Sequence, residues 1–173
     1  VIKTAFKNGS IKNVFSSETR PWFQGARLTS WELQQAQIPV TVVIDSAIAS
    51  VMINNKIAWL IVGSDRIAAN GDVANKIGTY SHAISAHYHG VKVMIVAPSS
   101  TVDMEVESGA DIKIENRGTE EVTDFKTTRI APNNIEAVNP GFDITPAKLV
   151  DVIVTEKGVI YNPDTKKMLA LFG

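Results

Sequence analysis

The chain has 173 residues, of which 45% are hydrophobic and 20% are charged, and its formal net charge at pH 7 is −1. This length and apolar content suffice for one buried core, so we expect residues 1–173 to form a single domain. The balanced charge argues against nucleic acid or a membrane surface as a partner. The chain contains no cysteine, which excludes disulfides, thiolate zinc sites and a cysteine nucleophile within these residues.

The apolar runs are all shorter than the roughly 18 residues that a bilayer-spanning helix needs, and the sequence shows no secretory prefix. These features predict a cytoplasmic protein. The first residues, VIKTAFKNG, are typical of the last turns of a helix that ends at Gly9. A chain that begins in this way, without methionine, is predicted to be the carboxyl-terminal part of a longer protein.

Strands and helices alternate along the first hundred residues or so. Hydrophobic periodicity and turn residues predict strands at 11–17, 41–46, 57–65 and 91–98, and helices at 24–37, 47–54 and 75–88. The run at 91–98 is almost uninterrupted in its apolar character, which is typical of a strand that is buried on both faces of a parallel sheet.

Residues 99–140 are more polar and carry acidic patches, which predicts mostly loop with short pieces of helix or strand. After them, Pro146 predicts the start of a short helix, Val152–Thr155 a last strand, and Lys157-Gly158 a turn. Strands that alternate with helices imply right-handed crossovers. We therefore predict an α/β fold of the Rossmann-like type, with a doubly wound, mostly parallel sheet in three α/β/α layers.

Neither a cofactor nor a metal is expected. The sequence lacks GxGxxG after the first strand and lacks GxxxxGK[ST] altogether, which removes most of the support for a dinucleotide or ATP. The three histidines, His82, His87 and His89, fall on one predicted helix, where neither the 82/87 pair nor the 87/89 pair shares a face well. A serine nucleophile at Ser99 or Ser100 has no histidine at a recognisable spacing.

Polar clusters follow three of the predicted strands, at 18–29, 63–76 and 97–103. Because the carboxyl ends of parallel strands lie at one edge of a sheet, residues from these clusters are expected to converge on one ligand site. Asp65 stands at the end of the apolar run IAWLIVGSD. Partial desolvation there would raise its pKa and suit it to general acid or base work; alternatively, it pairs with Arg66 or caps a neighbouring loop.

Three further side chains are candidates for binding a ligand. Asn75 and Lys76 are predicted to lie at the opening of a helix, whose free backbone N–H groups attract anions, and a lysine there adds a point charge that suits phosphate. The alternative is that Asn75 caps the helix and Lys76 is solvated. The amide of Gln24 could contact a sugar hydroxyl, or it could be an ordinary residue at a helix start.

Four segments together resemble a known family: ETRPWFQGARLTSWEL, GSDRIAANGDVANKIGTYSHAISAHYHGV, APSSTVD and NPGFDITPAKLVDVIVTEKGVI. They are similar to the methylthioribose-1-phosphate isomerases, which are related to ribose-1,5-bisphosphate isomerases and to regulatory subunits of the translation-initiation nucleotide-exchange factor. The resemblance runs from Val1 to about Ile160. It implies an intramolecular oxidoreduction of methionine salvage, in which the aldose 5-methylthioribose 1-phosphate becomes the ketose 5-methylthioribulose 1-phosphate without metal or cofactor.

The resemblance also assigns roles. The aspartate of the G-[AS]-D-R-I segment, a catalytic acid or base, corresponds to Asp65, and the substrate-binding glutamine and Asn-Lys pair correspond to Gln24, Asn75 and Lys76. It further implies a homodimer and an amino-terminal helical domain with phosphate-binding arginines and a catalytic cysteine; these residues lie upstream of Val1 in the family pattern. A non-catalytic regulatory module of the exchange-factor type, or a sugar-phosphate-binding domain without turnover, is the alternative.

Overall fold

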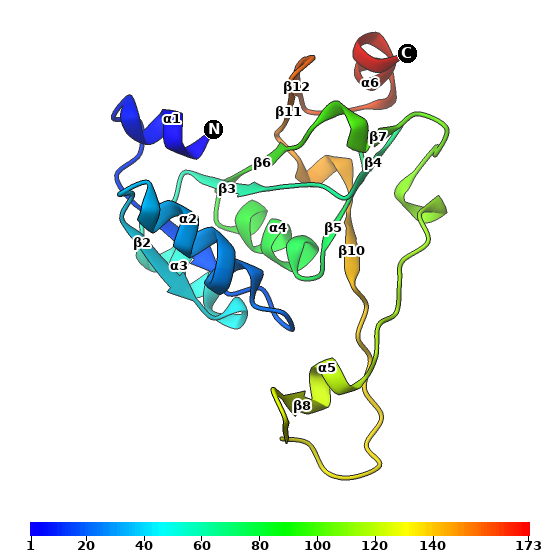
Figure 1. Ribbon diagram of the computed structural model, residues 1–173. Helices are drawn as coiled ribbons and strands as arrows, with labels where there is room; N and C mark the ends of the chain where they lie inside the picture. Colours follow the sequence, from blue (N-terminus) through cyan, green and yellow to red (C-terminus); the bar gives the residue numbers. More distant parts are fainter.

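The computed structural model describes all residues from Val1 to Gly173. Figure 1 shows a main body built from helices and strands and a long excursion, coloured yellow-green to yellow, that leaves this body and returns to it through β10. We call residues 112–141 the arm. None of the helices is long and apolar enough to cross a bilayer.

The helices are short. They are α1 (Ile2–Lys7), α2 (Ser30–Gln35), α3 (Ile48–Asn54), α4 (Thr79–Tyr88), α5 (Glu120–Thr123) and α6 (Thr165–Phe172). A π-helical turn, Gly25–Thr29, leads into α2. The strands are β1 (Val14–Ser17), β2 (Val40–Val43), β3 (Trp59–Val62), β4 (Arg66–Ala68), β5 (Val73–Lys76), β6 (Lys92–Val96), β7 (Val102–Asp103), β8 (Asp124–Phe125), β9 (Thr128–Arg129), β10 (Phe142–Thr145), β11 (Val152–Thr155) and β12 (Gly158–Tyr161).

These strands form two four-stranded sheets and two pairs. The first sheet has the order β12-β11-β6-β3, in which β3, β6 and β11 are parallel and β12 returns antiparallel to β11. The second has the order β10-β5-β4-β7, and in it only β4 and β7 are parallel. β1 and β2 form a separate parallel pair, and β8 and β9 form a hairpin in the arm.

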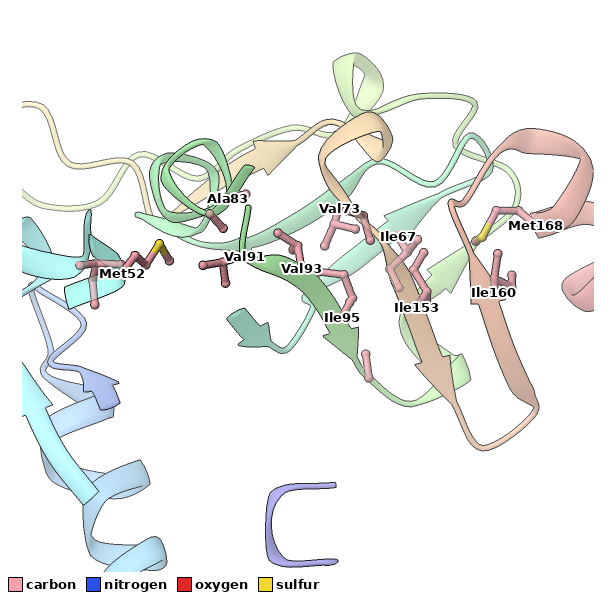
Figure 2. Packing of buried hydrophobic residues seen from close by; sticks show 14 of the residues in the cluster. Met52, Ile67, Val73, Ala83, Val91, Val93, Ile95, Ile153, Ile160 and Met168 are labelled. Atoms are coloured by element: carbon pink, nitrogen blue, oxygen red, sulfur yellow. The ribbon is translucent and has the colours of Figure 1, made fainter. Parts of the chain in front are cut away.

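The two four-stranded sheets share one core. Figure 2 shows its side chains as a continuous series from Met52 of α3 to Met168 of α6. Ile67 and Val73 of the second sheet belong to the same cluster of 15 buried residues as Ile95 and Ile153 of the first sheet. Ile67, Val73 and Ile95 are completely inaccessible to solvent. Burial of such branched side chains contributes roughly 1.5–3 kcal/mol each, so this cluster is what fixes the second sheet on the first.

The α/β class is confirmed, and so are most elements in the first half of the chain. The helix before Gly9, the strand at 152–155 and the loop-rich character of 99–140 occur as predicted. The prediction of one mostly parallel sheet is wrong in its extent, because the second sheet is largely antiparallel. The three-layer arrangement of a Rossmann-like fold stays a prediction.

The largest error concerns residues 66–78. The sequence predicted a turn and then a helix from residue 75, whereas the structure has a hairpin of β4 and β5, and α4 begins only at Thr79. Asn70-Gly71 forms the hairpin turn, with Gly71 at a φ of +88°. An Asn-Gly pair between short strands is a strong hairpin signal, but the flanking alanines, aspartate and lysine have low strand propensity and favoured the helix.

Candidate functional site

Asp65 lies in the connection between β3 and β4. Its backbone N–H donates to the carbonyl of Ala74 at 2.9 Å, and Arg66 pairs with the same Ala74 in the β4–β5 ladder. Extending this antiparallel register by one residue places Asp65 beside Asn75. The predicted strand at 57–65 is shorter in the structure, because β3 ends at Val62, and the Asp65 side chain is exposed in these 173 residues rather than partly desolvated.

A cavity of about 270 Å³ opens beside the Asp65 side chain, and polar residues dominate its lining: Asp65, Arg66, Asp111, Ile112 and Lys113. Asp65 does not form the ion pair with Arg66 that the sequence analysis gave as an alternative. The guanidinium of Arg66 instead contacts the carboxylate of Asp103 at 3.0 Å, across the parallel β4–β7 pair. Asp65 is left without an ion-pair partner, at the edge of a cavity large enough for a small polar ligand.

Asn75 and Lys76 are the last residues of β5, not the first residues of a helix. The antiparallel partners of Asn75 and Lys76 in β10 are Asp143 and Phe142. The Asn75 Nδ2 donates to the hydroxyl of Thr79 at 2.9 Å, and that hydroxyl donates to the carbonyl of Lys76 at 2.7 Å. Asn75 thus links the end of the strand to the start of α4 without acting as its N-cap.

The Lys76 ammonium is available for an anion. It lies 4.6 Å from the centroid of the Phe142 ring and forms no ion pair with a carboxylate. A cation over an aromatic face keeps its charge, because the ring quadrupole stabilises it without neutralising it. This geometry suits a lysine that holds a phosphate as a point charge.

The start of α4 is already occupied by a carboxylate. Asp143 accepts hydrogen bonds from the backbone N–H groups of Gly78 at 2.8 Å and Tyr80 at 3.1 Å. Burial raises the pKa of Asp143, and these two N–H groups and His82 oppose the rise. The predicted anion site at this helix start is therefore wrong, because the N–H groups there already bind a carboxylate. Asp143 was missed because it lies more than 60 residues from its partners.

Gln24 belongs to the connection between β1 and α2. Its Oε1 is buried and has no hydrogen-bond partner. A buried oxygen without a donor costs about 1–3 kcal/mol, and such an exception calls for a partner outside these 173 residues, such as a water molecule or a ligand. A hydroxyl group of a bound sugar is a donor of the right kind.

The backbone around Gln24 is tightly constrained. The Asp45 carboxylate accepts from the backbone N–H groups of Thr19 at 2.8 Å and Arg20 at 2.6 Å, and also from the Ser17 hydroxyl. Thr19 and Phe23 both have positive φ, +64° and +57°. A β-branched residue in this region is rare, and strained conformations of this sort cluster at ligand sites. Nothing in the sequence except the position of Asp45 after β2 indicated that its carboxylate would bind the segment before Gln24.

The candidate residues come from two places. Asp65, Asn75 and Lys76 lie together through the β4-β5-β10 ladder, whereas Gln24 comes from the separate β1-β2 pair. The prediction of a single sheet edge is wrong to that extent. The third cluster, 97–103, contributes Asp103 as the partner of Arg66, and Ser99 donates to Glu156 instead of facing a histidine.

The arm is closed at its base by an acidic residue and its donors. The Glu121 carboxylate contacts the Arg117 guanidinium at 2.6 Å and accepts from the Asn139 Nδ2 at 3.0 Å. The hydrogen bond from Arg117 is the main reason that the pKa of Glu121 falls to about 2, with smaller contributions from Asn139 and Trp22 and an opposing effect of burial. The carboxylate is only 13% exposed.

We expect this cluster to make the stability of the protein depend on pH at the acidic end. A carboxylate with a lowered pKa stabilises the folded state above its unfolded value of 4.5, and this contribution disappears as the pH falls through about 2. Glu121→Gln should therefore lower the free energy of unfolding at pH 7 and converge with the parent near pH 2 in urea titrations. A difference that stays constant over this range would contradict the assignment.

Comparison with known proteins gives a consistent result. Residues 1–162 match the Initiation factor 2 subunit family. The methylthioribose-1-phosphate isomerase of Pseudomonas fluorescens (strain Pf0-1) is 54% identical over 171 residues, which are 99% of this chain and 48% of that protein. The one of Marinobacter nauticus is 52% identical over 172 residues, 99% of this chain and 49% of that protein. The chain spans about half the length of these relatives.

Two solved structures have the same fold. The 5-methylthioribose 1-phosphate isomerase from Pyrococcus horikoshii OT3 is 46% identical with a TM-score of 0.93, over 98% of this chain and 47% of that one. The translation initiation factor eIF-2B, subunit delta, from A. fulgidus is 39% identical with a TM-score of 0.89, over 98% of this chain and 50% of that one. Sequence and structure agree, and the chain belongs to the Initiation factor 2 subunit family.

Proposed function

We propose that the chain is the carboxyl-terminal, Rossmann-like part of an aldose-ketose isomerase that converts 5-methylthioribose 1-phosphate to 5-methylthioribulose 1-phosphate in the cytoplasm. The observation that carries this proposal is the placement of an unpaired carboxylate, Asp65, beside Asn75 and the ion-pair-free ammonium of Lys76. Identity of 54% to an isomerase over nearly the whole chain favours the same substrate class.

The roles follow from the chemistry of the residue types. Lys76 would hold the phosphate as a point charge, and Gln24 would accept a hydrogen bond from a sugar hydroxyl through its unsatisfied oxygen. Asp65 would act as the acid or base. The phosphate on the anomeric oxygen blocks easy ring opening, so an acid must protonate the ring oxygen while hydrogen moves from carbon two to carbon one. This movement proceeds as a proton through an enolate or as a hydride.

A closed site would strengthen both steps, because electrostatic interactions gain strength when water is excluded. The cavity at Asp65 is open and its carboxylate exposed within these residues. We propose that an upstream amino-terminal domain covers this cavity and supplies the cysteine that the chain lacks.

The direct test is an assay of ketose formation from 5-methylthioribose 1-phosphate. We expect turnover by the complete protein, that is, the chain together with its upstream sequence, and none by the 173-residue chain alone. Absence of turnover by the complete, folded protein would refute the isomerase assignment. Turnover by the chain alone would instead refute the need for upstream residues.

A second candidate is a non-catalytic regulatory module, which the similarity to eIF-2B subunit delta at 39% identity favours. An isomerase and a regulatory module differ in whether they need the side chains of the candidate site. A module of this kind has no chemical use for Asp65 or Lys76, so their replacement would leave its partner binding unchanged.

We also propose a homodimer, for which exposed Tyr80, Ile84 and Tyr88 of α4 offer an apolar face. A monomer in sedimentation at high concentration would contradict it.

A further inference from the structure

The arm connects elements of both halves of the candidate site. Its incoming end, Ile112 and Lys113, lines the cavity at Asp65. Its outgoing end continues into β10, whose Phe142 and Asp143 are the ladder partners of Lys76 and Asn75. These two ends therefore belong to the half of the site that lies on the second sheet.

The far end of the arm contacts the other half. The Phe125 ring, in the β8–β9 hairpin, lies against the Phe23 ring edge to face, with centroids 6.0 Å apart and an interplanar angle of 86°. The Phe23 ring also contacts the Arg20 guanidinium, which lies 5.1 Å from its centroid. Phe23 directly precedes Gln24, so the aromatic contact acts on the backbone that carries the unsatisfied oxygen.

The two stems of the arm are joined by a bridge and hydrogen bonds at the base of the arm. The two stems pair through a bridge between Asn116 and Pro140, and the Arg117 N–H donates to the carbonyl of Asn139 at 2.8 Å. The Asn139 Nδ2 also donates to the Gly118 carbonyl at 2.9 Å, and Asn139 is only 4% exposed. A closed base lets the position of one end of the arm constrain the other.

From this arrangement we infer that the arm is a positioning element, which holds Gln24 at a fixed separation from Asp65, Asn75 and Lys76 through the Phe125–Phe23 contact. The inference rests on the proposed function. Phe125 is 46% exposed and contributes to no buried core cluster, so its conformation serves a local contact and not the stability of the body. Phe125 acts through Gln24 and touches no reacting atom.

The test uses Phe125→Ala in the complete protein. Loss of one aromatic pair should raise KM for 5-methylthioribose 1-phosphate by about threefold to tenfold and leave kcat within about twofold. Phe125→Tyr keeps the ring and should restore the parent KM. The matched control is Val138→Ala, which removes an apolar side chain of the arm that is 84% exposed, and it should have no effect.

A double-mutant cycle separates positioning from a general structural role. If Phe125 acts through Gln24, then Gln24→Ala and the double variant Gln24→Ala with Phe125→Ala should have the same KM. Additive effects of the two substitutions would overturn the inference even if the parent is an active isomerase.

A second readout needs no turnover, which separates this inference from the isomerase assignment. Phe125→Ala should speed amide hydrogen exchange at residues 23–27, where the Arg27 N–H donates to the carbonyl of Phe23 at 2.7 Å, and leave exchange in β6 unchanged. Unchanged protection at 23–27 would overturn the inference whether or not the protein is an isomerase.

Discussion

Replacement of Asp65 by Asn in the complete protein should lower kcat by roughly 10²–10⁴-fold while KM changes much less, as expected for the loss of a general acid or base. The amide keeps the size and much of the hydrogen bonding of the carboxylate but cannot transfer a proton. Folding should survive, because the Asp65 side chain is exposed and forms no ion pair, while its backbone N–H bond to Ala74 does not depend on the side chain.

Lys76→Ala is the informative comparison, because it should change a different kinetic constant. It removes the ammonium that lies 4.6 Å from the Phe142 ring, and we expect KM for the sugar phosphate to rise more than kcat falls. Equal unfolding midpoints for the parent and both variants would show that these changes are chemical. If Asp65→Asn left kcat within a few-fold of the parent, the carboxylate would be structural and the acid would have to be another residue.

Replacement of Gly25 by Ala should have the largest effect on stability among the glycines near the site. A β-carbon there would lie 1.7 Å from the carbonyl oxygen of Ser17 and 2.9 Å from the Thr19 Oγ1, so the backbone has to move. Overpacking of this kind costs about 1–3 kcal/mol, which corresponds to a fall of roughly 2–12 °C in the melting temperature of a chain of this size. Because Gly25 follows Gln24 directly, substrate binding should weaken as well.

Gly63→Ala is the matched control. Gly63 stands near Asp65, but its added β-carbon would find its nearest contact, the Asn75 Oδ1, only at 4.0 Å. Its substitution should change the free energy of unfolding by less than about 0.5 kcal/mol. Thermal unfolding of both variants measures the difference, and equal melting temperatures would mean that the segment around Gly25 relaxes without loss.

Sequence patterns predicted those parts of the fold that depend on local order. The strand Val152–Thr155 is continuous in its apolar character and occurs with the predicted bounds. Four short elements were not predicted: β4, β10, β12 and α6. Their conformation depends on pairing in the sheets or packing in the core more than on the propensities of their own residues. Met168 of α6 is fully buried although its neighbours in sequence are mostly exposed.

The sequence placed the candidate residues in clusters but did not predict the geometry of those clusters. Asp65 and the Asn75-Lys76 pair were placed in one cluster by their spacing, and the β4–β5 hairpin brings them together. The roles of Asp143, Asp45 and the arm were not predictable, because each depends on contacts between residues far apart in the chain. Long-range contacts of this kind leave no period in the sequence.

The contact between Phe23 and Phe125 also has a kinetic consequence. It joins residues about a hundred positions apart, and contacts between residues so distant in sequence form late, so we expect the arm to dock after the sheets have assembled. Because Phe125 is 46% exposed and lies outside the buried core cluster, release of the arm should need less free energy than unfolding of the two sheets. Trypsin should therefore cut at Lys126 or Arg129 under conditions in which the two sheets are still folded, and ligand bound at Gln24 should slow that cleavage.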